Sequence, residues 1–274
     1  MKVYIYTDKS NDKYEILEAR FLSMGHEVEL ISTLDHLDPE NDVIIATNVD
    51  QQYLIFKKYC PLGNIYNMLD DKIGFYDYLK KNVDLLDGIK LIPHYDFYYR
   101  GPNVTKDFLV KERYGYSSAF NQIIHGSAYE MIKDHSHKSQ VQDILEIKHI
   151  YGVSVSSLQG KILGAYSYLT NEGICHSSYD TGFTAKRNNY IENIRVRNFI
   201  RKIVHRLKYN GIMEMEFLID NKDVLHIMEC NARISGSLRV PHYLDWVIMP
   251  YVIGIHYKTY TEWDLNDQSK WIDI

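Results

Sequence analysis

The stretch from Gly211 to Ser237 constrains the fold more than any other part of the sequence. Two apolar runs in it flank the turn-forming residues 220–223, and this pattern predicts a β-hairpin. Side chains alternate between the two faces of a strand. If the turn holds an even number of residues, we therefore expect Glu216, Glu229 and Asn231 to lie on one face of the pair.

Two carboxylates held side by side are unfavourable unless a cation lies between them. A Mg²⁺ ion bridging to the phosphates of a nucleotide would account for both acidic residues. The alternative is a hairpin whose polar face is solvated and binds nothing. The run E-x-N-x-R-x-S from Glu229 to Ser235 favours the metal, as does the apolar character of the opposite face, which carries Phe217, Ile219, Val224 and Met228.

This hairpin, with its run ECNARIS, resembles the metal-binding hairpin of ATP-grasp enzymes. The resemblance is strongest to the synthetase domains of the carbamoyl phosphate synthase large chain and of biotin carboxylase. It implies that Glu216, Glu229 and Asn231 hold Mg²⁺ and that Arg233 faces an acyl phosphate intermediate.

Composition places the chain among ordinary globular proteins. Its 274 residues are 45% hydrophobic and 24% charged, and the net charge of −5 gives no reason to expect nucleic acid or an anionic membrane as a partner. The longest apolar run, 246–255, is too short to cross a bilayer. Three scattered cysteines predict neither a disulfide framework nor a zinc site, and the N-terminus lacks a signal-peptide pattern, so we expect a cytoplasmic protein.

The N-terminal part alternates strands and a helix. Apolar strands are expected at 3–7, 27–32 and 42–46, with a helix ending at Gly25, which together predict a parallel sheet. A further helix opens near Lys72 with an aspartate available as its N-cap. By itself Lys72 reads as a solvated lysine or as an anion contact at a helix N-terminus. The resemblance implies that it binds phosphate.

Lys111 closes the apolar strand 108–111 and either reaches solvent or contacts phosphate. The loop 112–119 that follows resembles the flap that covers the phosphates in ATP-grasp enzymes, but it contains a single glycine, Gly115, where that flap is glycine-rich. This departure puts lid closure and turnover in question.

Three further segments resemble nucleotide contacts of the same family. In the strand 141–146, Gln142, Asp143 and Leu145 resemble the hinge that reads adenine. Farther along the chain, His176 resembles a nucleotide contact and Lys186 a basic group near the γ-phosphate. The helix predicted over 190–209 has a basic face, which we interpret as solvated.

The resemblance implies an α/β fold of the ATP-grasp type with an α+β lid. The expected parts are a Rossmann-like N-terminal lobe at 1–93, a small lid at 94–150 and a C-terminal antiparallel-sheet lobe at 151–274 that carries the metal site. The ordered set of matching residues runs through nearly the whole chain.

The implied function is an ATP-dependent ligase joining a carboxylate to an amine or similar nucleophile, through an acyl phosphate, with release of ADP and phosphate. Lys111 and Arg233 are its candidate catalytic residues. The cofactors would be ATP and one or two Mg²⁺ ions, with Mn²⁺ as a substitute. The partners would be a small-molecule or peptide carboxylate and the nucleophile, in a monomer or a homodimer. Two alternatives stay open: an ATP-binding module without turnover that acts as a sensor or partner, and a kinase on the same scaffold.

Overall fold

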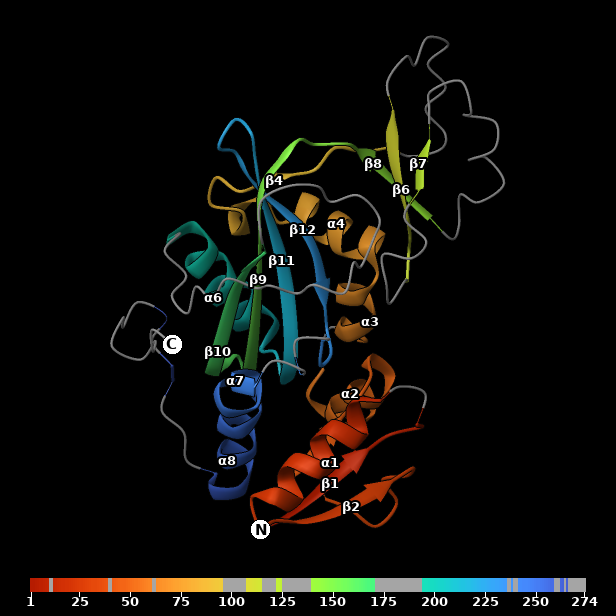
Figure 1. The fold of residues 1–274 in the computed structure, drawn as a ribbon, viewed down its shortest axis with the longest axis vertical. Helices are drawn as coiled ribbons and strands as arrows, with labels where there is room; N and C mark the ends of the chain where they lie inside the picture. The colour runs from red at the N-terminus through yellow and green to blue at the C-terminus, as the bar shows by residue number, and fades with distance from the viewer. Residues whose placement is uncertain are drawn as a thin grey trace.

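The computed structural model describes residues 1–9, 12–38, 41–60, 63–95, 107–114, 122–124, 139–170, 194–235, 238, 241–258, 262–263 and 265. Figure 1 shows a small sheet at the N-terminal end, a larger sheet with its helices in the middle, and a third sheet at the opposite end. The predicted α/β fold, with parallel and antiparallel sheets in different parts of the chain, is confirmed.

The N-terminal lobe is built on the predicted parallel sheet. Its strand order is β2-β1-β3, and both neighbours of β1 run parallel to it. Helix α1 buries Leu17 and Phe21 and ends before Gly25, whose φ of 77° gives the left-handed turn expected at a helix C-terminus. The elements are β1 (Lys2–Tyr6), α1 (Lys13–Ser23), β2 (Glu27–Ile31) and β3 (Ile44–Ala46).

A buried glutamine on the next helix joins this lobe to the large sheet. Helix α2 (Val49–Phe56) is followed by the short turn η1 (Lys57–Tyr59). From α2, the amide nitrogen of Gln52 donates to the Tyr209 hydroxyl at 2.6 Å and to the carbonyls of Ile212 and Ala232 at 3.1 and 2.9 Å. A Cβ at Gly211 would lie 2.6 Å from this amide, so the close approach needs a glycine there.

The middle of the molecule is a five-stranded sheet of order β10-β9-β11-β12-β4. Strands β9 to β12 are antiparallel to their neighbours, whereas β4 pairs parallel to β12. One face is covered by α6, where the rings of Phe199 and Phe217 meet edge to face with centroids 5.7 Å apart. The elements are β4 (Lys90–Leu91), β9 (Ile147–Leu158), β10 (Lys161–Thr170), α6 (Ile194–Leu207), β11 (Gly211–Asp220) and β12 (Leu225–Asn231).

Two short helices pack against β12. The helix predicted to open near Lys72 is confirmed, but the segment before it is also helical, and the two are separated at Asp71, which has extended backbone. The elements are α3 (Ile65–Asp70), α4 (Lys72–Lys81) and the turn η2 (Val83–Leu85). These residues, which belong to the predicted N-terminal lobe 1–93, thus contact the large sheet.

The third sheet has the order β5-β8-β6-β7, with every pair antiparallel. Phe108, Val110 and Val141 form a small core of their own, separate from the main core of the molecule. The elements are β5 (His94–Tyr95), β6 (Phe108–Glu112), β7 (Gln122–Ile124) and β8 (Ser139–Asp143). This sheet lies within the predicted lid, 94–150, whose last four residues already belong to β9.

The last described helices run without a break from Pro241 to Tyr257. They are α7 (Pro241–Tyr243), the π-helical turn η6 (Leu244–Ile248) and α8 (Met249–Tyr257). Pro241 begins the run, and Pro250 lies in the first turn of α8, where its missing N–H costs no helical hydrogen bond. Among the described residues, no helix is both long and apolar enough to span a membrane.

Candidate functional site

The hairpin places the predicted acidic residues together, although its turn differs from the expected one. Five residues, 220–224, lie between the last paired residues Ile219 and Leu225, so the turn is odd rather than even. A bulge at Met228 then shifts the register by one. Glu216 consequently lies opposite Glu229, and the pleat puts both side chains on one face.

Asn231 lies on the same face, opposite Glu214 on β11. Glu214 was not predicted as a site residue, although its spacing of two from Glu216 in the sequence MEMEF indicates a shared face. Its carboxylate oxygen Oε2 accepts hydrogen bonds from the hydroxyls of Ser154 and Ser235, both at 2.7 Å. Glu214 therefore fixes the start of the segment after β12 to the sheet.

Glu216 and Glu229 are two acidic side chains that lie close together in a buried environment. Burial and the neighbouring carboxylates of Glu229 and Glu214 raise the pKa of Glu216 to about 8. Burial also acts to raise the pKa of Glu229, but the positive charges of Lys72, Lys111 and Arg233 outweigh it and lower that pKa. The pair therefore disfavours carrying two negative charges at once.

This arrangement fits a divalent cation. Glu216 and Glu229 offer carboxylate oxygens and Asn231 an amide oxygen on one face, which is the hard-oxygen donor set that Mg²⁺ takes. A cation there would remove the repulsion that raises the pKa of Glu216. Among the described residues, no group of three or more His, Cys, Asp or Glu side chains could hold a metal ion.

Two lysines approach the carboxylates from different parts of the fold. Lys72, the first residue of α4, places its Nζ 3.8 Å from Oε2 of Glu229, with only 9% of its side chain exposed. Lys111 lies on β6 of the third sheet, is 4% exposed, and acts on both Glu216 and Glu229 through its charge. The sequence left open that each of these lysine side chains is solvated, but both are largely buried.

The N-terminus of α4 is closed by protein groups. The Lys72 N–H donates to the Arg113 carbonyl at 3.3 Å, and the Ile73 N–H donates to Oδ1 of Asp71 at 3.0 Å. An aspartate was predicted as the N-cap, and Asp71 takes this role; it also receives two hydrogen bonds from Arg113, at 2.7 and 2.6 Å, and one from the Tyr114 hydroxyl at 3.1 Å. Any anion contact at this helix must therefore come from the Lys72 side chain and not from these two N–H groups.

Arg233 is held by internal partners. Its Nη2 donates to Oδ1 of Asn231 at 2.9 Å, and its Nε lies 3.4 Å from Oδ1 of Asp70 at the end of α3. The residue is 6% exposed. Burial raises the pKa of Asp70, against the opposing charge of Arg233. Asp70 was not predicted as part of the site.

The predicted hinge lies where the chain passes from the third sheet to the five-stranded sheet. Gln142 and Asp143 end β8, and Leu145 belongs to the three residues that lead into β9. Gln142 is buried, and Asp143 accepts a hydrogen bond from the Tyr95 hydroxyl at 2.8 Å. The other predicted nucleotide contacts, His176 and Lys186, lie outside the described residues.

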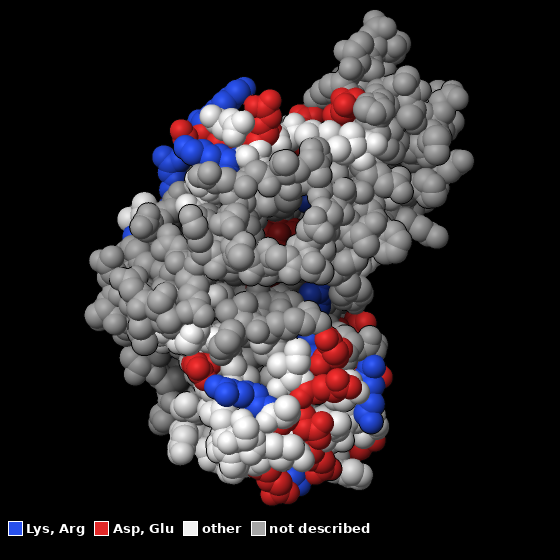
Figure 2. Space-filling view, viewed as in Figure 1, with Lys and Arg blue, Asp and Glu red and all other residues white. Residues whose placement is uncertain are grey.

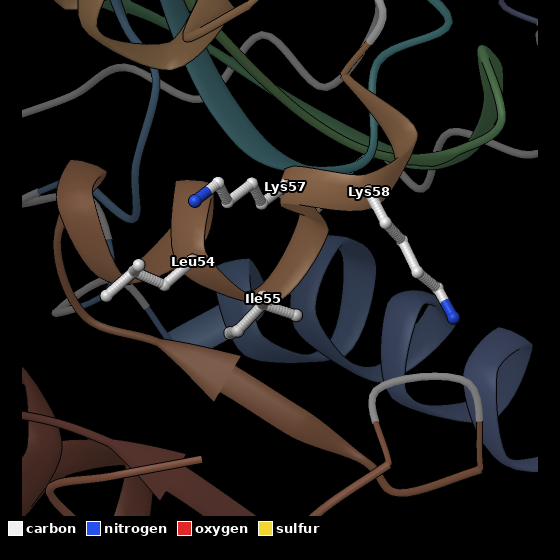
Figure 3. A pocket seen from close by; sticks show the side chains of 4 residues that line it. All are labelled: Leu54, Ile55, Lys57 and Lys58. Atoms are coloured by element: carbon white, nitrogen blue, oxygen red, sulfur yellow. The ribbon is translucent and has the colours of Figure 1, made fainter. Parts of the chain in front are cut away.

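The surface shows two further features. On the face in Figure 2, acidic side chains gather over the N-terminal lobe in the lower half of the view. Figure 3 shows a separate, open hollow beside α2 and η1, lined by Leu54, Ile55, Lys57 and Lys58. None of these four residues belongs to the hairpin site.

The class of fold follows from comparison with solved structures: the chain has the ATP-grasp fold, as predicted. No family model matches the sequence, and no curated protein matches it. The narrower resemblance to carbamoyl phosphate synthase and biotin carboxylase domains stays a prediction.

Three of the similar structures illustrate the match. N5-carboxyaminoimidazole synthetase from Staphylococcus aureus has a TM-score of 0.59 and 16% identity, over 95% of this chain and 78% of that one. D-alanyl-alanine synthetase A from Vibrio cholerae has a TM-score of 0.60 and 13% identity, over 94% and 98%. A RiPP-associated ATP-grasp ligase from Chryseobacterium gregarium, in complex with ADP and a leader and core peptide, has a TM-score of 0.61 and 12% identity, over 95% and 98%.

Proposed function

We propose that this protein is an ATP-dependent ligase that joins a carboxylate to an amine or similar nucleophile and releases ADP and phosphate. The observation that carries the proposal is the convergence of Glu216 and Glu229 with Lys72 and Lys111, contributed by a hairpin, a helix and the third sheet. Paired carboxylates suit a divalent cation, and the adjoining lysines suit phosphate oxygens. The ATP-grasp fold of the chain supports the same function.

In this proposal the protein's own groups overcome the repulsion between two anions. Lys72 and Lys111 would neutralise charge on the ATP phosphates, and Glu216, Glu229 and Asn231 would hold Mg²⁺, which supplies further positive charge at the transferred phosphoryl group. Arg233 would turn toward the substrate carboxylate and stabilise the acyl phosphate.

The proposed reaction proceeds in two steps. A carboxylate oxygen attacks the γ-phosphorus and ADP leaves, which gives the acyl phosphate. The nucleophile's nitrogen then attacks the carbonyl carbon, phosphate leaves, and the nitrogen loses a proton to solvent. The buried Lys111 and the closed N-terminus of α4 would limit water near the phosphates.

The test is ADP release by the full chain with ATP, Mg²⁺ and a panel of carboxylates and amines. We expect release that requires both co-substrates, with an amide product identified by mass. A stable phosphorylated product would instead indicate a kinase, and nucleotide binding without release would indicate a binding module.

The variant Glu229→Gln tests the assignment of Glu229 as a metal ligand. Because the amide cannot share a cation with Glu216 as a carboxylate does, we expect turnover to fall by about a hundredfold or more, with an unchanged circular dichroism spectrum. Glu27→Gln, on an exposed part of β2, is the control and should retain activity. Near-full activity of Glu229→Gln would contradict the metal assignment.

A further inference from the structure

A glutamine of the third sheet lies beside both candidate phosphate lysines and has no role in the function proposed above. Gln140 is in β8, directly opposite Lys111 on the neighbouring strand β6 (Figure 1). Residues that lie directly opposite each other in an antiparallel pair place their side chains on one face of the sheet, with Cβ atoms about 4.5–5.5 Å apart. The Gln140 side chain also reaches α4, where its Nε2 donates to the Lys72 carbonyl at 3.4 Å.

The Lys72 carbonyl determines the orientation of the Gln140 amide. A carbonyl only accepts hydrogen bonds, so the amide nitrogen must face it and the amide oxygen must point elsewhere. This oxygen, Oε1, is buried and has no hydrogen-bond partner within the part of the chain that the structure describes. The residue as a whole is 4% exposed.

A purely structural role does not explain this oxygen. A buried acceptor without a donor costs folding free energy, and an apolar side chain of similar length would avoid that cost. The other face of the same two strands is indeed apolar, since Val110 and Val141 lie opposite each other in the small core of the third sheet. The polar side chain is thus on the face that carries Lys111, and its cost is explained if Oε1 gains a donor when a ligand binds.

The Lys111 ammonium is the donor on the neighbouring strand. It carries three N–H groups, and its charge already acts on Glu216 and Glu229. A phosphate oxygen takes one of these N–H groups and leaves others for protein acceptors. Because the lysine side chain is long and flexible, a second hydrogen bond is needed to fix the direction of its ammonium.

We infer that Gln140 is a positioning residue for the phosphate site: its amide joins the Lys72 backbone to the Lys111 ammonium and holds that ammonium where it binds a polyphosphate. The base of this connection is firm, because the Lys72 N–H also donates to the Arg113 carbonyl at the end of β6. The inference rests on the proposed function for the role of Lys111. It can be measured by binding, without turnover.

The experiment is a double-mutant cycle on the full chain. Calorimetry gives the Kd of Mg-ADP and of magnesium tripolyphosphate for the wild type, Gln140→Met, Lys111→Met and the double variant. We expect Gln140→Met to weaken binding about tenfold when Lys111 is present, which corresponds to about 1.4 kcal/mol. In the Lys111→Met background the same change should cost about twofold or less. Tripolyphosphate has no base or ribose, so a loss with both probes places the effect at the phosphates.

Stability separates positioning from a structural role. Because Gln140→Met removes a buried acceptor without a donor, we expect its urea midpoint without ligand to be no lower than that of the wild type. Gln140→Leu is a second apolar variant and should behave alike. Gln159→Met, at an exposed glutamine between β9 and β10, is the control and should bind both probes as the wild type does.

The inference is overturned if neither probe binds, if Gln140→Met binds as tightly as the wild type, or if its loss is equal in the two backgrounds. Unfolding of both apolar variants would also overturn it, because it would show that Gln140 is needed for the fold. Failure of the proposed function gives a different result, in which the coupling to Lys111 is present but no pair of carboxylate and amine releases ADP.

Discussion

At the scale of single residues, Asp71 shows how one carboxylate joins two parts of the site. It caps α4 through Ile73 and receives the Arg113 guanidinium from the end of β6, so the elements that carry Lys72 and Lys111 are tied at one point. A Cβ at residue 74 would lie 3.1 Å from the Asp71 carboxylate, which explains why a glycine follows in the first turn of the helix.

Arg113→Met tests this tie. Burial would raise the pKa of Asp71, but the hydrogen bonds from Arg113 outweigh it and lower that pKa, so the ionised carboxylate stabilises the fold. We expect the variant to lose about 2 kcal/mol of unfolding free energy at neutral pH, because two charge-assisted hydrogen bonds are removed.

The pH dependence of that loss has a definite sign. A lowered pKa in the folded state contributes stability above the unfolded value of about 3.9, and the contribution disappears as pH falls through the folded pKa. Urea denaturation should therefore give a constant difference between wild type and variant from about pH 7 to 5, and a smaller difference below about pH 4. A difference that grows on acidification would contradict the account. Asp71→Asn is the matched control, since it lacks the titrating group.

At the scale of elements, the hairpin shows what alternation can and cannot predict. The shared face of Glu216, Glu229 and Asn231 is present, yet it arises from two irregularities that compensate, an odd turn and a bulge at Met228. Without the bulge, Glu229 and Asn231 would point to the apolar face. A bulge depends on pairing across the sheet, including the pairing of β11 with β9, and no local pattern specifies it.

The rest of the fold shows the same difference between features that a local pattern predicts and features that it does not. Strands and helices with clear periodicity, such as β1, α1 and α6, lie where the pattern predicts them, because their apolar stripe is their buried face. Lys13, Asp70 and Gln52 contribute through contacts between distant segments, which single-sequence patterns do not contain.

The packing of β10 on the C-terminal helices gives an element-scale prediction. A Cβ at Gly164 would lie 2.1 Å from the Trp246 carbonyl and 2.8 Å from Cγ of Pro250. We expect Gly164→Ala to cost about 3 kcal/mol or more, because the helix would have to move from the sheet.

Gly25→Ala is the control for that substitution. Its added Cβ meets open space, so only the left-handed backbone, with φ of 77°, is strained, at about 1 kcal/mol. Urea denaturation of the two variants measures the contrast. Equal losses would show that the contact between β10 and η6 is looser than the structure indicates.

At the scale of the whole molecule, the candidate site exists only where three separately built parts meet. The hairpin brings the carboxylates, α4 brings Lys72, the third sheet brings Lys111, and the N-terminal lobe reaches the same hairpin through Gln52 and Lys13. A ligand bound to all of these groups would connect the parts and stabilise the whole chain against unfolding.

Thermal unfolding with nucleotide and metal tests that connection. A ligand at about a hundred times its Kd adds about 2.7 kcal/mol, which for a chain of this size raises Tm by about 5–10 °C. Because the metal would link the carboxylates to the nucleotide, we expect Mg-ADP to reach this shift and either component alone to fall well short. Glu229→Gln should remove only the part of the shift that needs Mg²⁺, whereas Lys111→Met should reduce the shift by ADP whether or not Mg²⁺ is present. An ADP shift in the wild type that does not depend on Mg²⁺ would separate the carboxylate pair from the nucleotide and contradict a single composite site.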